Sequence, residues 1–453
     1  MVYESLLEAK MRILLIDPCK EPMTSGARKR GVTRFPQISL LYIAALTPEE
    51  HAVKIVEEEI EPIDFDAPCD LVGITCMTAN APRAYKLADD FRRRGRRVVL
   101  GGVHPTVRPD EAALHADAVV VGEAEPVWGT LLADAAAGAL KPRYANDHTW
   151  LLDDYPTPRR RGGKSGAVLG IVPVVTSRGC PYACDFCSVH NMFGRVIRHV
   201  AVPRVLEDIE QSGSRHVMFL DDNIVGDQGY AEKLFDGLRG RGISWVGQAS
   251  ISFVHNERLL EKAAASGCKG LFIGLESVSE QKMEKLRKSL KTQVETADAI
   301  RRIMRAGILF HASIVLGFDD DELSIFDETI DFLQRTRIAS ATFNILTPYP
   351  GTVLFDQYKS EGRLLTEDWK DFDHCTPTFN PRHMSAEELV EGYNHVRQSF
   401  FSLRNIAARL PANWRTPILF AVANLGLRVQ VRADQARLRQ GIGRPVVSAL
   451  GGV

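Results

Sequence analysis

Three cysteines stand close together in the middle of the chain, in a C-x3-C-x2-C arrangement formed by Cys180, Cys184 and Cys187. They follow an apolar, β-branched run at 171–176 that is typical of a buried strand. Thiolates are ligands of iron–sulfur clusters and of zinc, so the loop after this strand can hold one inorganic centre. Three cysteines would leave one iron of a four-iron cluster without a protein ligand. That open iron could bind a substrate or a cofactor.

Two other interpretations of the motif are open at this point. His190 follows Cys187 by three residues, so the three cysteines and His190 could form a closed structural zinc site. Three free structural cysteines are a further alternative, although the chain has only eight cysteines and this spacing is close. The strands and helices that position the motif distinguish these interpretations.

The composition is that of an ordinary soluble globular protein with two or three domains. The chain has 453 residues, of which 45% are hydrophobic and 25% charged, and its formal net charge is −1. Without a global basic field, we expect no nucleic-acid partner. No apolar stretch is long enough for a signal peptide or a transmembrane segment. Together with clustered cysteines, this predicts a reducing, cytoplasmic location.

Residues 10–140 alternate between short apolar strands and helices, which predicts a parallel, doubly wound, Rossmann-like sheet. Ligands bind outside the carboxyl ends of the strands in such sheets. The polar and glycine-containing strand ends should therefore line one cofactor site. The residues expected there are Thr75, Thr78, Gly102, His104, Gly122 and Glu123.

A linker is expected at 141–170, and a second alternating region follows at 171–353. The six strands expected in it are 171–176, 215–220, 244–250, 269–274, 308–316 and 339–346. Six strands with intervening helices predict an open, partial (β/α)6 barrel, with its chemistry at the carboxyl ends of the strands. Every one of those ends carries polar residues, an arrangement that a structural zinc site does not need. The pattern therefore favours a cluster.

The region 171–353 resembles the core of the radical S-adenosylmethionine (radical SAM) enzymes. The cysteine motif matches the cluster motif of that family, and Phe186 fits the aromatic residue that usually precedes the third cysteine. Where the family commonly has Gly-Gly-Glu, this chain has Asp221-Asp222-Asn223. The resemblance implies that SAM is contacted by strand-end residues. These are Asp222, Asn223, Ser250, Glu276 and Gly317.

The amino-terminal region resembles the cobalamin-binding module that precedes many radical SAM enzymes. The matching residues are Gly101-Gly102-x-His104 and Gly122-Glu123, where glycines let the backbone approach a large ring. The chain lacks the D-x-H-x-x-G pattern that supplies a histidine to cobalt. We therefore expect His104 to line the pocket and not to ligate cobalt.

The resemblance to the cobalamin-binding class implies a [4Fe-4S] cluster, SAM and cobalamin as cofactors, and an external flavodoxin- or ferredoxin-like electron donor. The implied reaction is reductive cleavage of SAM to a 5′-deoxyadenosyl radical, followed by methylation of an unactivated carbon through methylcobalamin. One alternative is a cyclase or rearrangement enzyme of the same architecture without net methyl transfer. Another is a non-catalytic cobalamin or cluster sensor.

Residues 354–453 are expected to form a mostly helical extension. The apolar stretch 417–427 is too short to span a bilayer and is flanked by arginines. A helix packed over the barrel and a helix lying on a membrane surface both fit this pattern. Membrane contact at the inner face would suit a lipid substrate, for which the hopanoid methylases are a precedent in the family. A small-molecule substrate is the alternative.

Overall fold

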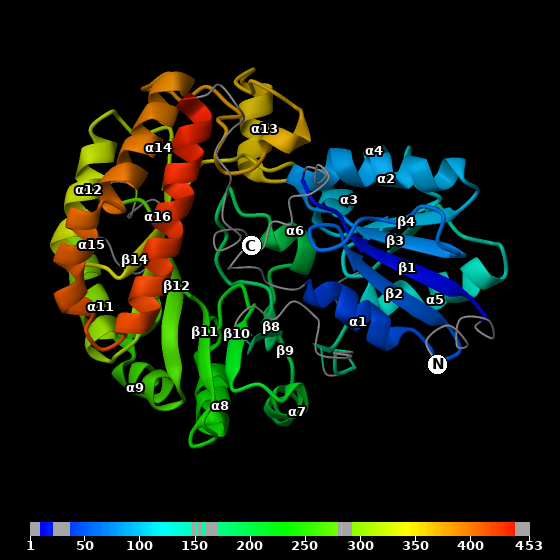
Figure 1. Ribbon diagram of the computed structural model, residues 1–453, viewed down its shortest axis with the longest axis horizontal. Coiled ribbons are helices and arrows are strands. Elements are labelled where there is room, and N and C mark those ends of the chain that lie inside the picture. The colour runs from blue at the N-terminus through cyan, green and yellow to red at the C-terminus, as the bar shows by residue number, and fades with distance from the viewer. Residues whose placement is uncertain are drawn as a thin grey trace.

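The computed structural model describes residues 10–20, 37–146, 150–152, 156–158, 170–279, 282 and 292–439. Two six-stranded parallel sheets organise these residues. The first sheet lies on the right of Figure 1 and the second on the left. Most carboxyl-terminal helices, in orange and red, lie beside the second sheet. The predicted fold class is confirmed, namely two consecutive α/β units followed by a mostly helical region.

The first sheet has the strand order β2-β1-β3-β4-β5-β6, and all its neighbours are parallel. Its strands are β1 Arg12–Asp17, β2 Ala52–Glu57, β3 Leu71–Thr75, β4 Arg97–Gly101, β5 Ala118–Val121 and β6 Arg143–Ala145. The central strands are continuous apolar runs because helices cover both faces of the sheet. The order reverses between β1 and β3, which creates the topological switch point where doubly wound sheets bind ligands.

Helices cover the two faces of this sheet unequally. On one face, α1 (Ile38–Leu46) packs beside α5 (Glu125–Ala136). The other face is covered by α2 (Ala81–Arg93), whose apolar side includes the fully buried Phe91. Phe355, Trp369 and Phe372 of the carboxyl-terminal region complete the core on that face. Three short helices follow strand ends, namely η1 Thr78–Asn80, α3 Val103–Val107 and α4 Pro109–Ala112.

The sheet extends into the stretch that was expected to be a linker. Residues 143–145 form the edge strand β6 and pair with β5, so the expected boundary at 141 falls too early. This strand has only three residues and exposes two of them, which explains why no apolar run marks it. The linker residues 147–149, 153–155 and 159–169 lie outside the described part of the chain.

The second sheet has the order β14-β13-β12-β11-β10-β7, and its strands are also parallel. They are β7 Ile171–Val174, β10 His216–Phe219, β11 Ser244–Ala249, β12 Cys268–Glu276, β13 Leu309–Leu316 and β14 Ser340–Ile345. The helices around them are α7 Val202–Ser212, α8 Gln228–Leu238, α9 Glu257–Ala265, α11 Gln293–Arg305 and α12 Ile325–Thr336, with the short η4 Ile251–His255. Sequential order without closure confirms the predicted open (β/α)6 barrel. A small antiparallel ribbon, β8 (Ser177–Arg178) with β9 (Arg198–His199), follows β7.

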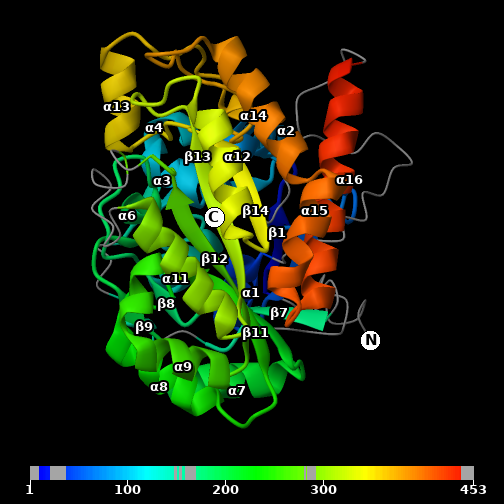
Figure 2. The same cartoon turned by 90° about the vertical axis from the view of Figure 1, so that its left-hand side faces the viewer.

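The carboxyl-terminal region packs mainly against the β14 side of the barrel (Figure 2). Its helices are α13 Val353–Ser360, η5 Trp369–Asp371, α14 Ala386–Phe400, α15 Leu403–Arg409, η6 Leu410–Asn413 and α16 Pro417–Arg439. α14 begins with a capping box in which Ser385 and Glu388 exchange side chain–backbone hydrogen bonds. Phe420 and Asn424 bury one side of α16 against Ala339, so this helix packs over the barrel. Within the described residues, no helix combines the length and apolar character needed to cross a bilayer.

Candidate active site between the two sheets

The three cysteines of the motif lie on one loop between β8 and α6 (Val189–Phe193), and all three are partly exposed. The backbone N–H of Cys187 donates to the carbonyl oxygen of Cys184 over 3.0 Å, and this turn holds the two residues together. Burial, with smaller contributions from the nearby Cys184 and Cys180 thiols, raises the pKa of the Cys187 thiol to about 12. Three thiols on one partly open loop are a donor set that fits an iron–sulfur cluster.

The alternative of a closed zinc site has no support in the geometry. Nε2 of His190 lies 3.3 Å from the carbonyl oxygen of Cys180, so the ring contacts the backbone of the cysteine loop. Within the described residues, no three His, Cys, Asp or Glu side chains converge on a single ion. The thiols of a four-iron cluster do not need to converge in this way, because each binds a different iron.

Tyr182 anchors the cysteine loop to the neighbouring strand end. Its hydroxyl lies 3.1 Å from Oγ of Ser250 and 2.8 Å from Oγ of Ser252, just beyond the end of β11. Ser250 was expected to face SAM, whereas Tyr182 and Ser252 were not singled out. Their pairing depends on two loops that meet only in the folded chain. In the sequence, the only indication of this contact was the tyrosine hydroxyl of Tyr182 inside the cysteine motif.

Two aspartates that follow β10 form hydrogen bonds with residues just before the cysteines. Oδ1 of Asp221 accepts from the hydroxyls of Thr176 (2.8 Å) and Ser177 (2.6 Å), and complete burial raises its pKa to about 6. Oδ2 of Asp222 accepts from the N–H of Gly179 over 3.1 Å, and burial likewise raises its pKa to about 6. Both carboxyl groups therefore brace the loop.

Asn223 shares the next strand end with Ser250. Its Oδ1 accepts a 3.0 Å hydrogen bond from the N–H of Ser250, so the ends of β10 and β11 are joined. Glu276, at the end of β12, has a positive φ of 65° at a bulge in the sheet. A non-glycine residue in this region is strained, and such strain clusters at functional sites. Glu276 is one of the residues expected to contact SAM, and its backbone is strained at the carboxyl end of β12.

The end of β13 combines a constrained glycine with three consecutive aspartates. Gly317 has φ +96°, and a Cβ there would lie 2.7 Å from Cδ2 of Leu389, so only glycine fits. The N–H groups of Gly317 and Phe318 each donate to Oδ2 of Asp321 over 2.9 Å. Burial raises the pKa of Asp321 to about 6. Phe318 also meets Phe186 of the cysteine loop edge to face, with ring centroids 5.8 Å apart.

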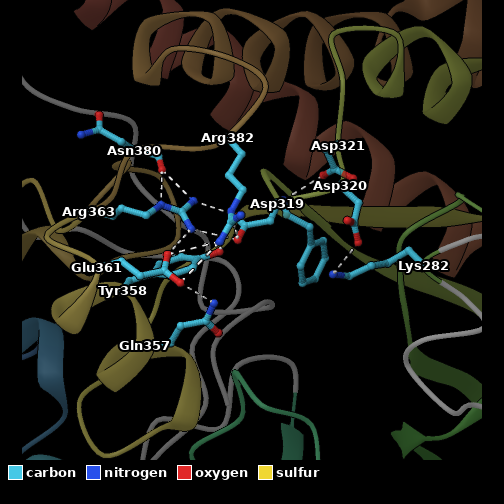
Figure 3. A network of polar contacts seen from close by, with 11 residues as sticks. Lys282, Asp319, Asp320, Asp321, Gln357, Tyr358, Glu361, Arg363, Asn380 and Arg382 are labelled. Carbon is cyan, nitrogen blue, oxygen red and sulfur yellow. Dashed lines mark hydrogen bonds and ion pairs between the residues drawn. The ribbon is translucent and has the colours of Figure 1, made fainter.

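The three aspartates point in three directions, as Figure 3 shows. Asp321 turns back to its own loop, and Asp320 lies 3.9 Å from Nζ of Lys282. Oδ2 of Asp319 accepts from Arg363 (2.9 Å) and Arg382 (3.0 Å) of the carboxyl-terminal region. Burial would raise the pKa of Asp319, but Arg363 outweighs it and lowers the pKa. Asp319 therefore ties the barrel mouth to its cover.

Polar side chains also line the neighbouring strands β13 and β14 on one face. Nε2 of His311 lies 2.7 Å from Oγ1 of Thr342, and burial lowers the pKa of His311 to about 3, so it is a neutral hydrogen-bonding residue. Two residues further along, Nδ2 of Asn344 lies 3.4 Å from Oγ of Ser313. Oδ1 of Asn344 is buried and meets no donor among the described residues. Asn344 was not predicted as a site residue.

The carboxyl edge of the first sheet faces this loop. Gly102 has φ +104°, and a Cβ there would lie 2.9 Å from the backbone of Cys76, so glycine lets β4 end against β3. Oγ1 of Thr106 donates to the carbonyl of Gly102 (2.7 Å) and accepts from the N–H of Gly122 (2.9 Å). Thr75 is partly exposed at this edge and Met77 is 44% exposed. This glycine-rich edge fits the close approach of a large ring.

Thr78 and His104 lie deeper than expected. Both are buried, and Nδ1 of His104 lies 3.3 Å from Oγ1 of Thr78. Nε2 of His104 lies 3.5 Å from Glu111, and the ring of Trp369 packs against it with centroids 5.0 Å apart. His104 is enclosed by protein groups.

Glu123, which was predicted to contact a cofactor, has protein partners in the structure. Its carboxylate is buried and forms ion pairs with Arg178 (2.6 Å) and Arg198 (2.7 Å). Both arginines belong to the ribbon that carries the cysteine loop. Glu123 therefore joins the two sheets, and the sequence could not reveal this because the partners lie on different domains.

A tyrosine–histidine pair lies beyond the end of β14. The hydroxyl of Tyr349 donates to the carbonyl of Phe372 (3.1 Å) and lies 2.9 Å from Nε2 of His374. His374 has a positive φ of 63°, and burial lowers its pKa to about 4, so its ring is neutral at pH 7. Tyr349 is therefore a hydrogen-bonding partner of His374.

The two facing sheet edges, one rich in glycine and one with three thiols, define an enzyme class that pairs a cobalamin-binding domain with a radical SAM barrel. Comparisons with known proteins agree. The family model for the B12 binding domain matches residues 31–131, and that of the radical SAM superfamily matches 174–333.

Two relatives come from Chlorobaculum tepidum. Bacteriochlorophyllide d C-12(1)-methyltransferase is 29% identical over 423 residues, covering 90% of this chain and 91% of the relative. Bacteriochlorophyllide d C-8(2)-methyltransferase is 31% identical over 359 residues, covering 74% and 79%. The chain therefore belongs to the cobalamin-dependent radical SAM enzymes, whose cofactors are a [4Fe-4S] cluster, SAM and cobalamin.

A solved structure shows the same fold over nearly the whole chain. It is that of the radical SAM methyltransferase TsrM from Kitasatospora setae, with cobalamin and a [4Fe-4S] cluster bound. The two structures align with a TM-score of 0.69 at 13% identity, covering 94% of this chain and all of the other.

Proposed function

We propose that this protein transfers a methyl group to an unactivated carbon of an apolar small molecule or lipid. The observation that supports this is the position of the cysteine loop. It lies at the mouth of the barrel and is joined directly to the carboxyl edge of the first sheet through Arg178 and Glu123. A substrate held there would lie within reach of both cofactor sites. A small-molecule substrate is suggested by the names of the two relatives, which are methyltransferases of bacteriochlorophyllide d.

Bound here, the cofactors supply the radical made by one-electron cleavage of SAM and the methyl group carried on cobalamin. The chain holds them in place. Cys180, Cys184 and Cys187 would ligate the cluster, and Tyr182 with Asp222 would keep their loop in position. The residues proposed to contact SAM are Asn223, Ser250, Glu276, Gly317 and Asn344.

On the other side, Thr75, Gly102 and Gly122 would line the cobalamin site. His104 and Thr78 would support that edge from beneath, since both are buried. The closely packed aromatic residues around Trp369 would keep water from this side of the site. We also propose a flavodoxin- or ferredoxin-like protein as the electron donor.

The test is an anaerobic assay of the full chain reconstituted with iron, sulfide and cobalamin, then supplied with SAM and a strong reductant. We expect both 5′-deoxyadenosine and S-adenosylhomocysteine, quantified by mass spectrometry. Cys184→Ala should abolish deoxyadenosine formation, whereas Cys268→Ala, at a buried cysteine remote from the motif, should retain it. Deoxyadenosine without S-adenosylhomocysteine, with candidate substrates present, would indicate a cyclase or rearrangement enzyme. Neither product from a cluster-loaded protein would indicate a sensor.

We further propose that α16 rests on an anionic membrane surface. Ile418, Val422, Leu425 and Val429 recur every three or four residues and are 80%, 46%, 50% and 69% exposed. The sequence contains no acidic residue between Glu391 and Asp434. Several arginines fall in this interval, among them Arg404, Arg415, Arg428 and Arg432. An apolar stripe flanked by positive charge suits a helix that lies in the interface of an anionic bilayer.

Co-sedimentation with vesicles tests this contact. We expect the full chain to bind vesicles of phosphatidylglycerol and phosphatidylcholine more strongly than vesicles of phosphatidylcholine alone. Ile418→Ser/Leu425→Ser should lose this binding, while Val294→Ser/Val353→Ser, at equally exposed apolar residues elsewhere, should keep it. Equal binding by both variants would contradict the proposal. A change from dimer to monomer in the first variant, without a change in vesicle binding, would instead identify a second copy as the occupant.

A further inference from the structure

A buried cluster of two acids and two arginines joins the two sheets. Nη1 of Arg178 lies 2.6 Å from Oε1 of Glu123, and Nη2 of the same arginine lies 2.7 Å from Oε1 of Glu125. Nη2 of Arg198 lies 2.7 Å from the other oxygen of Glu123. Each of these four side chains is at most 10% exposed.

The two arginines come from the base of the cysteine loop. Arg178 and Arg198 face each other as register partners across the β8–β9 ribbon, and the loop with all three cysteines lies between them in the sequence. Only Gly179 separates Arg178 from Cys180. Gly179 has φ +97°, and a Cβ there would lie 2.7 Å from the carbonyl oxygen of Val196. A displacement of either arginine would therefore be transmitted to the loop.

The two acids come from the edge of the first sheet. Glu123 follows Gly122, just after β5 ends, and Glu125 is the first residue of α5. The same strand end is tied to Gly102 through Thr106, so the acids are fixed relative to the glycine-rich edge. Each ion pair thus has one member beside the end of β5 and one on the β8–β9 ribbon that carries the cysteine loop.

The stability of this charge cluster depends on the relative position of its acids and arginines. Burial alone would raise the pKa of Glu123, but Arg178 and Arg198 outweigh it, and its pKa stays below the ordinary value. Buried charges are tolerated only when they are paired in good geometry, and a guanidinium that binds two carboxylates has little freedom to shift. The four charges sum to zero, so separation of the sheets would leave unpaired charges on both sides.

We propose that Glu123, Glu125, Arg178 and Arg198 are positioning residues that set the separation between the cobalamin site and the cluster. This inference rests on the proposed cofactor sites. The four side chains form ion pairs with one another. They keep the source of the radical and the carrier of the methyl group aligned on one substrate.

The experiment compares the full chain with Glu123→Gln, both loaded with cluster and cobalamin. Pulsed EPR measures the distance distribution between the reduced [4Fe-4S] cluster and cob(II)alamin, which are both paramagnetic. We expect the variant to hold both cofactors, with a clearly broader distribution than the wild type. In turnover, S-adenosylhomocysteine formed per deoxyadenosine should fall several-fold while deoxyadenosine formation continues. Arg198→Lys retains the charge but not the planar geometry and should give an intermediate result.

The matched control breaks a similarly buried ion pair that does not join the sheets. Arg397 and Asp434 lie 2.7 Å apart between α14 and α16, with side chains 9% and 3% exposed. Arg397→Gln should lower thermal stability without changing the EPR distance distribution. The proposal would be overturned by an unchanged distribution and product ratio in Glu123→Gln, or by equal changes in Arg397→Gln. If the wild type forms no S-adenosylhomocysteine, the proposed methyl transfer fails, yet the EPR comparison still tests this inference.

Discussion

Polar residues at the ends of parallel strands serve two purposes in this protein. Some, such as Glu276 with its positive φ and Asn344 with a buried Oδ1 that meets no donor among the described residues, are the ones that we propose contact SAM. Others, such as Glu123, Asp222 and Asp319, have carboxylates that form hydrogen bonds or ion pairs with protein groups and hold the loops in place. The sequence alone does not distinguish ligand-binding from structural polar residues at strand ends, because the partner of a carboxylate depends on contacts that form only in the folded chain.

His374 provides a test at this scale. Its pKa is lowered by burial from 6.5 to about 4, so between these values the unfolded chain binds a proton that the folded chain does not. Falling pH therefore destabilises the folded state through this residue. His374→Asn, which also accepts the positive φ, should gain stability relative to wild type as pH falls from 7 to 4.5. We expect a relative gain of up to ~2 kcal/mol, because partial exposure of the ring reduces the full effect.

Urea unfolding of both proteins at several pH values measures this difference. The buried Asp221, Asp222 and Asp321 have raised pKa values and act in the opposite direction, but they are present in both proteins and cancel in the comparison. Parallel stability curves for the two proteins would show that His374 titrates normally.

Among the elements, those with a long apolar pattern could be predicted from the sequence. The first sheet has the predicted alternation of strands and helices, and the six strands of the barrel match the predicted runs and follow one another as expected. The ribbon of β8 and β9 was missed because two residues carry no periodicity, and β6 because it is an exposed edge. The cysteine spacing predicted the loop but not its supports. Tyr182 and Arg178 depend on contacts between elements far apart in the chain.

At the scale of the whole molecule, the carboxyl-terminal region belongs to both sheets. α14 and α16 extend the core of the barrel, whereas Phe355, Trp369 and Phe372 complete the core of the first sheet. Trp369 is the centre of the second contact, because its Nε1 donates to Glu111 over 2.7 Å and its ring covers His104. The carboxyl-terminal region therefore contacts both sheets and holds them together. The cluster of Glu123, Glu125, Arg178 and Arg198 forms a second connection, next to the cysteine loop.

Trp369→Ala should destabilise the chain by ~3 kcal/mol, since a buried aromatic ring is lost and Glu111 loses a donor. Trp414→Ala removes the same side chain at a position that is 67% exposed. It should change stability by no more than ~0.5 kcal/mol. Differential scanning calorimetry of both variants and the wild type measures this. Equal effects would mean that the contact between η5 and the first sheet contributes little.

The shared core also has a consequence for synthesis. The first sheet leaves the ribosome with its α2 face incomplete, since Phe355, Trp369 and Phe372 are made only after the whole barrel. During that interval its apolar surface is open to chaperones, and its carboxyl edge is not yet opposed by the cysteine loop. The order of translation thus leaves the α2 face and the carboxyl edge of the first sheet uncovered until the barrel and its cover have been made.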